Sequence, residues 1–120
     1  AAIVVTGSTS SIRGLDVAPL YSAAKHGVAG LVKSVAPTLA EHKIRINMVA
    51  PGLVNTPMMG FQDGDKLRDP ASLTMIPHLE GANPQYIAET VLFLGSPAAG
   101  YLNGSILVAD GGLMTGHPIV

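Results

Sequence analysis

Residues 3–8, which read IVVTGS, decide the fold class of this chain. Their β-branched side chains predict a short buried strand that ends at Thr6, and the Gly/Ser-rich residues after it predict a loop. From about Leu20 to Glu41, apolar residues recur at three- and four-residue spacings, which is typical of a helix that buries one face. The chain therefore begins with a strand, a loop and a helix.

The same alternation of strands and helices continues to the end of the sequence. Residues 44–50 (IRINMVA) and 105–109 (SILVA) read as two further strands, which end at residues 51–52 (PG) and 110–112 (DGG). Residues 83–94 begin with an Asn-Pro pair, an N-cap followed by a first-turn proline, and predict a second helix. This order predicts an α/β fold with a parallel sheet, right-handed crossovers and helices on both faces.

Two segments depart from a regular pattern. Pro37 lies inside the first helix, where it removes a hydrogen bond and crowds the carbonyl of Lys33, so we expect a kink or a break there. Residues 53–83 form a long connection rich in Gly, Pro and Asp. Connections of this length are usually functional lids or disordered segments.

The composition narrows the class of protein. With 120 residues the chain allows one small domain, and its 12% of charged residues is about half the usual share, which indicates large internal surfaces. The net charge of -1 without a basic block gives no sign of nucleic acid or anionic membrane as a partner. The chain has no cysteine, its histidines lack ligand spacing for a metal, and its apolar runs are too short to span a bilayer. Without a signal-peptide pattern, a cytoplasmic location is the expectation.

Tyr21 and Lys25 carry the most informative chemistry. Four residues apart on a helix, their side chains lie on one face. An ammonium beside a phenol stabilises the phenolate, so the pair could exchange a proton near neutral pH, as alcohol oxidation or carbonyl reduction requires. Ser8 follows the first strand, thirteen residues before Tyr21, and ligands of doubly wound sheets bind outside the carboxyl ends of the strands. We therefore expect the Ser8 hydroxyl to bond a substrate oxygen near this pair.

Plainer explanations stay open for each of these residues. The phenol and the ammonium could form an ordinary surface pair, because short motifs match freely. Ser8 could merely cap a turn, a role that Ser10 or Ser11 would also fill. His26 suggests a Ser8–His26 hydrolase, but the chain has no G-x-S-x-G motif and no well-placed acidic partner. We expect His26 to be a solvated or interface residue.

Together the motifs resemble the C-terminal half of the short-chain dehydrogenase/reductase family. The resemblance extends over nearly the whole chain, in the family's order and spacing. Its motifs are residues 3–8, residues 21–28 with the serine spacing, residues 44–52, Val54, residues 56–58, residues 87–94 and residues 102–112. The resemblance implies that residues 1–120 are the C-terminal half of one Rossmann-type domain, a doubly wound parallel sheet. It also implies NAD(P)-dependent hydride transfer between an alcohol and a carbonyl.

The resemblance also implies roles for single residues. Ser8 would polarise the substrate oxygen, Tyr21 would be the general acid/base, and Lys25 would stabilise the tyrosinate and hold the nicotinamide ribose. The cofactor would be NAD or NADP. The residues lining its nicotinamide end would be Tyr21, Lys25, Pro51, Gly52, Val54 and Thr56.

The substrate side of the site falls in the long connection. Residues 53–83 would be the variable substrate loop, in which Met58, Met59 and Phe61 would shape a rather apolar pocket for a small alcohol or ketone. Thr56 could instead only start a turn or helix before Pro57.

The family places upstream a Gly-rich turn for the pyrophosphate, a residue that selects NAD or NADP, and a catalytic asparagine. These 120 residues contain none of them, so we expect them to be part of a longer chain or to need an N-terminal half from elsewhere. Alone they would be inactive and poorly soluble, with an unpaired edge on the first strand. The family also implies a homo-oligomer, a dimer or tetramer, with Gly27, Gly30 and Leu31 near an interface. The alternative is a truncated, inactive remnant that acts as an assembly or interaction module.

Overall fold

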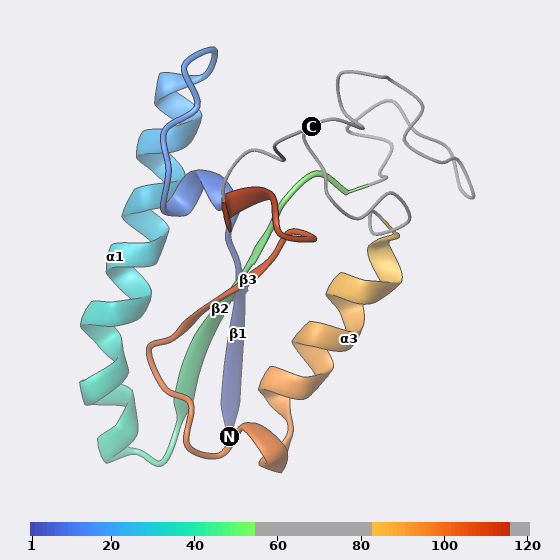
Figure 1. The fold of residues 1–120 in the computed structure, drawn as a ribbon. Coiled ribbons are helices and arrows are strands. Elements are labelled where there is room, and N and C mark those ends of the chain that lie inside the picture. Colours follow the sequence, from blue (N-terminus) through green and yellow to red (C-terminus); the bar gives the residue numbers. More distant parts are fainter. Residues whose placement is uncertain (55–82, 116–120) are drawn as a thin grey trace.

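Three parallel strands form the sheet of this protein. The structure, a computed structural model, describes residues 1–54 and 83–115. The strands β1 (Ala2–Thr6), β2 (Arg45–Pro51) and β3 (Ile106–Ala109) are all parallel and lie in the order β1-β2-β3 (Figure 1). Each predicted strand is confirmed to within one residue at its ends. The predicted fold class, part of a doubly wound parallel sheet, is confirmed as well.

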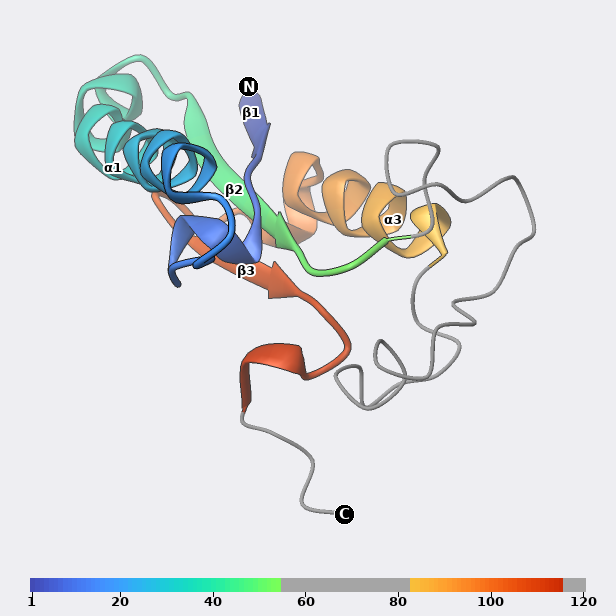
Figure 2. The ribbon, with the colours of Figure 1, turned by 90° about the horizontal axis from the view of Figure 1, so that it is seen from above.

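Two long helices cover the two faces of the sheet. Seen from above, α1 (Pro19–Glu41) and α3 (Pro84–Gly95) lie on opposite sides of the strands (Figure 2). Asn83 caps α3 as predicted, because its Oδ1 accepts a hydrogen bond of 2.9 Å from the amide of Gln85. Within residues 1–54 and 83–115, no helix has the length and apolar character needed to cross a membrane.

The hydrophobic core lies between α1 and the sheet. Residues of α1 and β2 form one buried cluster. Val5 of β1 and Ile106 of β3 pack against it, so all three strands contribute to the core. Burial of this apolar surface is the main force that holds α1 on the sheet. The buried members of the cluster are Ala29, Val32, Ala36, Ile46 and Met48.

Pro37 does not interrupt α1. The helix runs without a gap from Pro19 to Glu41, so the predicted break is wrong. Pro37 has no amide proton to donate to the carbonyl of Lys33. Both residues are exposed, so water can reach that carbonyl instead. Ala36, one residue earlier, is buried in the core and holds this turn of the helix against the sheet.

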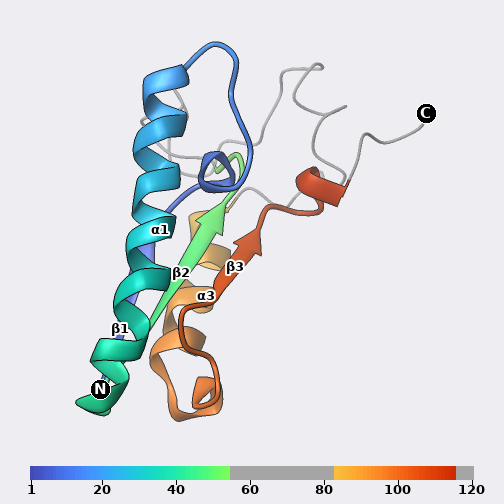
Figure 3. The same ribbon diagram turned by 90° about the vertical axis from the view of Figure 1, so that its left-hand side faces the viewer.

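The two crossovers of the sheet have opposite hands. Figure 3 shows the sheet from the α1 side, with the strands pointing up and β1, β2 and β3 following one another from left to right. With α1 in front, the step from β1 to β2 is right-handed; with α3 behind, the step from β2 to β3 is left-handed. The prediction of right-handed crossovers is therefore wrong for the second one. The usual hand arises where a twisted strand leads into its helix, but here residues 52–83 separate β2 from α3 and α1 already covers the other face.

A polar network closes the sheet at the amino ends of the strands. The guanidinium of Arg45 donates to the carbonyls of Leu94 (3.1 Å), Ser96 (3.0 Å) and Leu102 (3.3 Å), at and after the end of α3. Asn47, which is 1% exposed, also donates to Leu102 (2.9 Å) and accepts from the amide of Ser105 (3.0 Å). Orphan carbonyls at a helix end thus receive side-chain donors, which fix α3 to β2.

Asn103 extends this network to α1. Its Oδ1 accepts from the amide of Ile46 (3.0 Å), and its Nδ2 donates to the carbonyl of Ala36 (3.3 Å). The next residue, Gly104, has a φ of 72°, a conformation that favours glycine. The turn before β3 is therefore tied to the sheet and to one helix by specific hydrogen bonds.

Candidate functional site

The sequence-predicted site residues that the structure describes lie at or after the carboxyl ends of β1 and β2 and on the first turns of α1. The carboxyl ends of the strands form the upper end in Figure 1, where the first turn of α1 also lies. The turn η1 (Thr9–Ser11) follows β1 there and packs against α1. In an open parallel sheet this end is where ligands bind.

Ser8 is held in place by a capping box. Its Oγ accepts a hydrogen bond of 3.0 Å from the amide of Ser10, and its own amide donates to Ser11 Oγ at 3.2 Å. The cap expected of Ser10 or Ser11 is thus formed by Ser8, with Ser11 as its reciprocal partner. Because the cap engages Oγ as an acceptor, the hydroxyl proton is still available for donation to a ligand oxygen. Capping and substrate binding are compatible in this geometry.

Gly7 makes the turn around Ser8 possible, a role that the sequence analysis missed. A Cβ at this position would collide with Met48 Sδ and would lie 2.8 Å from Ser11 Oγ. The amide of Gly7 continues the sheet by donating to the carbonyl of Val49 at 2.8 Å. A glycine directly after a buried strand and before a serine was the available signal.

Tyr21 and Lys25 form the predicted pair on the first turns of α1. The Lys25 Nζ lies 5.6 Å from the centroid of the Tyr21 ring, within the range of a cation–π interaction. Tyr21 is 46% exposed, so its hydroxyl can be reached from outside. Within the described residues, neither the phenol nor the ammonium has a hydrogen-bond partner, and both are available to a ligand.

The local fold also fixes where α1 begins. Pro19 occupies its first turn, and Ser22 Oγ accepts from the amide of Leu15 at 2.9 Å, which ties the preceding loop to the helix. His26 Nδ1 lies 2.8 Å from the carbonyl of Ser22 and must donate its proton there, since a carbonyl only accepts. His26 thus bonds to its own helix, which gives no support to a Ser8–His26 hydrolase.

The turns after β2 and β3 pack against each other at this end. The amide of Gly52 donates to the carbonyl of Ala109 at 3.2 Å, and a Cβ on Gly52 would lie 2.8 Å from Asp110 Cβ. Asp110 accepts from the amides of Gly112 (2.9 Å) and Met114 (2.7 Å) through its two carboxylate oxygens. This clamp, which the sequence analysis did not anticipate, fixes the turn after β3.

The remaining candidates divide between described and undescribed parts of the chain. Three of them are half-buried at or just after the carboxyl end of β2, the end of the sheet where the candidate site lies: Pro51, Gly52 and Val54. The others lie outside the described residues: Thr56, Met58, Met59 and Phe61.

The described residues suit the nicotinamide end of a dinucleotide. The site offers one hydroxyl donor at Ser8, one phenol at Tyr21 and one ammonium at Lys25, at the end of the sheet where the strands finish. Lys25 and Tyr21 would hold the ribose, and residues 51–54 would line the ring. A bound nicotinamide would accept or supply a hydride there.

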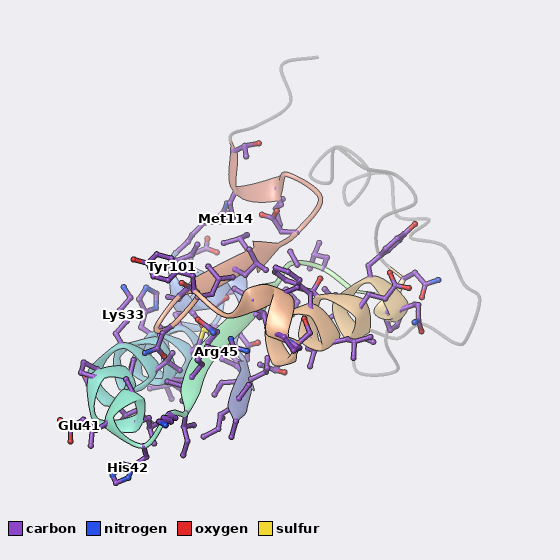
Figure 4. All side chains as sticks on the ribbon, turned by 90° about the horizontal axis from the view of Figure 1, so that it is seen from below. Lys33, Glu41, His42, Arg45, Tyr101 and Met114 are labelled. Atoms are coloured by element: carbon purple, nitrogen blue, oxygen red, sulfur yellow. The ribbon has the colours of Figure 1, made fainter. Side chains whose placement is uncertain are left out.

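A separate cavity lies at the opposite end of the molecule. It measures about 570 Å³ and lies at the amino ends of β1 and β2, beside Lys43, Arg45 and Tyr101. Figure 4 looks at the molecule from this lower side, with Arg45 and Tyr101 labelled. None of the predicted site residues lines this cavity, so it is not the predicted site.

Comparison with known proteins gives a consistent picture. A family model described as Enoyl-(Acyl carrier protein) reductase matches residues 1–114. The short-chain dehydrogenase anuF of Penicillium roqueforti is 43% identical over 112 residues, which are 92% of this chain and 40% of that protein. The crystal structure of acetoin dehydrogenase YohF from Salmonella typhimurium superimposes with a TM-score of 0.84 at 39% identity. It covers 99% of this chain, which in turn covers 46% of it.

A third relative carries a cofactor. The structure titled ElxO with NADP bound has a TM-score of 0.82 and 28% identity, and the two chains overlap over 96% of this chain and 47% of ElxO. This chain thus spans less than half the length of the relatives it matches. The match of the family model, the sequence identities and the shared fold show that the chain belongs to the short-chain dehydrogenase/reductase family of oxidoreductases.

Proposed function

We propose that the protein to which this chain belongs interconverts an alcohol and a carbonyl, with NAD or NADP as the hydride carrier. The observation that carries the proposal is the state of Ser8, whose Oγ is fixed by its cap while its proton stays free to donate. A hydroxyl in this state can bind a substrate oxygen without losing its own position. The exposed Tyr21 and the ammonium of Lys25 supply the proton chemistry at the same end of the sheet.

In the oxidation direction, the Tyr21 phenolate takes the proton of the substrate hydroxyl. Lys25 stabilises the phenolate before that transfer, and Ser8 donates a hydrogen bond to the substrate oxygen as it becomes a carbonyl. A nicotinamide held by Tyr21, Lys25 and the residues after β2 would accept the hydride from the carbinol carbon. In the reduction direction, Tyr21 returns its proton to the carbonyl oxygen, so each turnover moves one hydride and one proton.

The cofactor residues remain part of the proposal. Besides the catalytic pair, we propose Pro51, Gly52, Val54 and Thr56 as the lining of the nicotinamide end. NADP in the related ElxO structure supports a nicotinamide cofactor for this family, and leaves the choice between NAD and NADP for this protein to experiment. Met58, Met59 and Phe61 would face a small alcohol or ketone substrate.

Two kinds of partner complete the proposal. An N-terminal half, in the same chain or supplied by another, would provide the dinucleotide site that the larger relatives have room for. A second copy would pack on α1, giving a dimer or tetramer. Added Cβ atoms on Gly27 or Gly30 would meet nothing within 4 Å, and Leu31 is 60% exposed, which supports a helix-packing surface there.

The decisive experiment replaces Tyr21 by Phe in the full-length protein. We expect kcat/KM to fall by about 10²–10⁴-fold, because general acid/base catalysis is worth that much, while the melting temperature stays unchanged. Tyr86→Phe is the matched control, since Tyr86 is an exposed tyrosine on α3, 54% accessible. Full activity in Tyr21→Phe would refute the mechanism. Titration with NADH, followed by fluorescence, tests the alternative of an inactive module, which predicts no binding.

A further inference from the structure

Arg13 is a cation whose backbone is fixed by the same turn as Ser8. It comes five residues after Ser8, and its amide donates to the carbonyl of Thr9 at 3.1 Å, directly behind η1. Its side chain is exposed. The backbone of Arg13 is thus tied by a hydrogen bond to the turn that directly follows the candidate catalytic serine.

The side chain of Arg13 reaches across the strand ends. Its Nη1 lies 3.8 Å from Met114 Sδ, although the two residues are 101 positions apart. Met114 follows β3 and is itself held through its amide by Asp110. The guanidinium therefore bridges from the turn after β1 toward the turn after β3, over the end of the sheet where the proposed reaction takes place.

The charge of Arg13 has no acidic partner in the described part of the chain. Its one polar contact there is a thioether, which is a weak acceptor. Asp110 is the acid next to Met114, and both its carboxylate oxygens accept backbone amides instead. Asp16, the acid nearest in sequence, is exposed and makes no recorded bond to Arg13. A guanidinium in this state is ready to pair with an anionic ligand.

The chain on either side of Arg13 exposes apolar side chains. The segment between Ser8 and Tyr21 exposes four of them, Ile12 (42%), Leu15 (39%), Val17 (82%) and Leu20 (85%). A ligand that met both features would combine an apolar body with one negative group.

We propose that Arg13 is a specificity-determining residue that binds a carboxylate on the substrate, so that the preferred substrates are hydroxy acids and the corresponding oxo acids. This inference rests on the proposed function and names its substrate class. The planar fork of one guanidinium matches one carboxylate through two parallel hydrogen bonds. The apolar body of the substrate lies on the exposed aliphatic side chains, and its carbinol end meets Ser8 and Tyr21.

The test compares matched acid and neutral compounds on the full-length protein with its cofactor. The turnover probes are 4-hydroxycyclohexanecarboxylate and its methyl ester; the binding probes, measured by calorimetry, are cyclohexanecarboxylate and cyclohexanecarboxamide. We expect a preference for the acid of about tenfold or more in kcat/KM and in Kd, since a charge-assisted pair adds at least that much. Arg13→Gln should abolish the preference, and Arg13→Lys should keep part of it. Lys33→Gln, the matched control on the outer side of α1, should leave it unchanged.

Several outcomes would overturn the inference. One is an equal affinity for acid and neutral probes in the wild-type protein. Another is an unchanged preference in Arg13→Gln. If that variant also lost stability, Arg13 would form a structural ion pair and not a substrate contact. Tighter binding of cyclohexyl phosphate than of the carboxylate would also contradict the assignment. The calorimetric arm needs no turnover, so binding of the acid through Arg13 in a protein without dehydrogenase activity would refute the proposed function and leave only the carboxylate site at Arg13 standing.

Discussion

The two ends of the sheet differ in how completely their polar side chains are engaged. At the amino ends of the strands, Arg45, Asn47 and Asn103 have their donors and acceptors engaged by backbone groups. At the carboxyl ends, Ser8 keeps a free proton, and Tyr21 has no hydrogen-bond partner in the described residues. Engaged polar groups fix a fold, whereas groups with remaining capacity can serve a ligand. The difference separates the structural end of this domain from its reactive end.

Substitutions at Ser8 test this difference with the largest expected effect. Ser8→Ala should lower kcat/KM by about 10²–10³-fold, as the loss of one oxyanion donor does, and should lower stability by about 1 kcal/mol through the lost cap. Ser8→Asp separates the two roles, because a carboxylate accepts the cap but donates nothing when ionised. We expect Ser8→Asp to keep the melting temperature and lose the activity. If it kept the activity, Ser8 would belong with the structural end.

Arg45→Met tests the opposite end. The carbonyls of Leu94 and Ser96 would lose the Arg45 donor, and that of Leu102 would keep only Asn47, so we expect the free energy of unfolding to fall by about 2–4 kcal/mol. Denaturant titration of the full-length protein measures this change. Lys33→Met, which removes an exposed cation from α1, should change stability by less than about 0.5 kcal/mol. A similar effect in both variants would show that the network contributes nothing specific.

Gly7→Ala tests stability and activity at one position, because Gly7 both packs against the core and supports the turn around Ser8. The added methyl group would collide with Met48 and displace Ser11, the partner of Ser8 in the capping box. We expect a loss of about 1–3 kcal/mol in stability together with a drop in kcat/KM. Gly95→Ala is the control, since its Cβ would meet nothing within 4 Å. Unchanged activity in Gly7→Ala would mean that Ser8 need not be held rigidly.

Lys43→Gly should give the smallest effect, and one of opposite sign. Lys43 has a φ of 58°, and the amides of Lys43 and Ile44 bond back to Ala40 (2.9 Å) and Leu39 (3.0 Å) at the end of α1. Glycine suits this left-handed position, so we expect a gain of about 0.5–1 kcal/mol without a change in activity. Thermal unfolding measures it. Lys43→Ala keeps the backbone strain and should show no such gain.

Local sequence signals predicted the elements of this fold well. The strands, the cap of α3 and the parallel arrangement follow from residue patterns that act over a few positions, such as Asn83 before Pro84. The break at Pro37 failed because packing of the neighbouring Ala36 outweighs one lost hydrogen bond. The prediction of a right-handed second crossover failed for a similar reason, since the occupied α1 face is a property of the whole sheet.

The site could be predicted in part. The spacing of Tyr21 and Lys25 followed from helix geometry, and their contact is present. The hydrogen bonds of Arg45 and the reach of Arg13 to Met114 join residues far apart in the chain, and no local pattern marks such pairs. The availability of the Ser8 hydroxyl proton could not be predicted either, because it depends on which group bonds to Oγ in the fold.

The left-handed crossover has a consequence for how the chain folds. The unit from β1 through α1 to β2 is continuous and right-handed, and its strands pair across a shorter stretch of chain than β2 and β3 do, so it can form first. β3 pairs with β2 across a longer stretch of chain, with α3 on the opposite face of the sheet, a closure with a larger entropic barrier. The turn held by Asp110, and with it the Met114 side of the site, is therefore among the last parts to assemble.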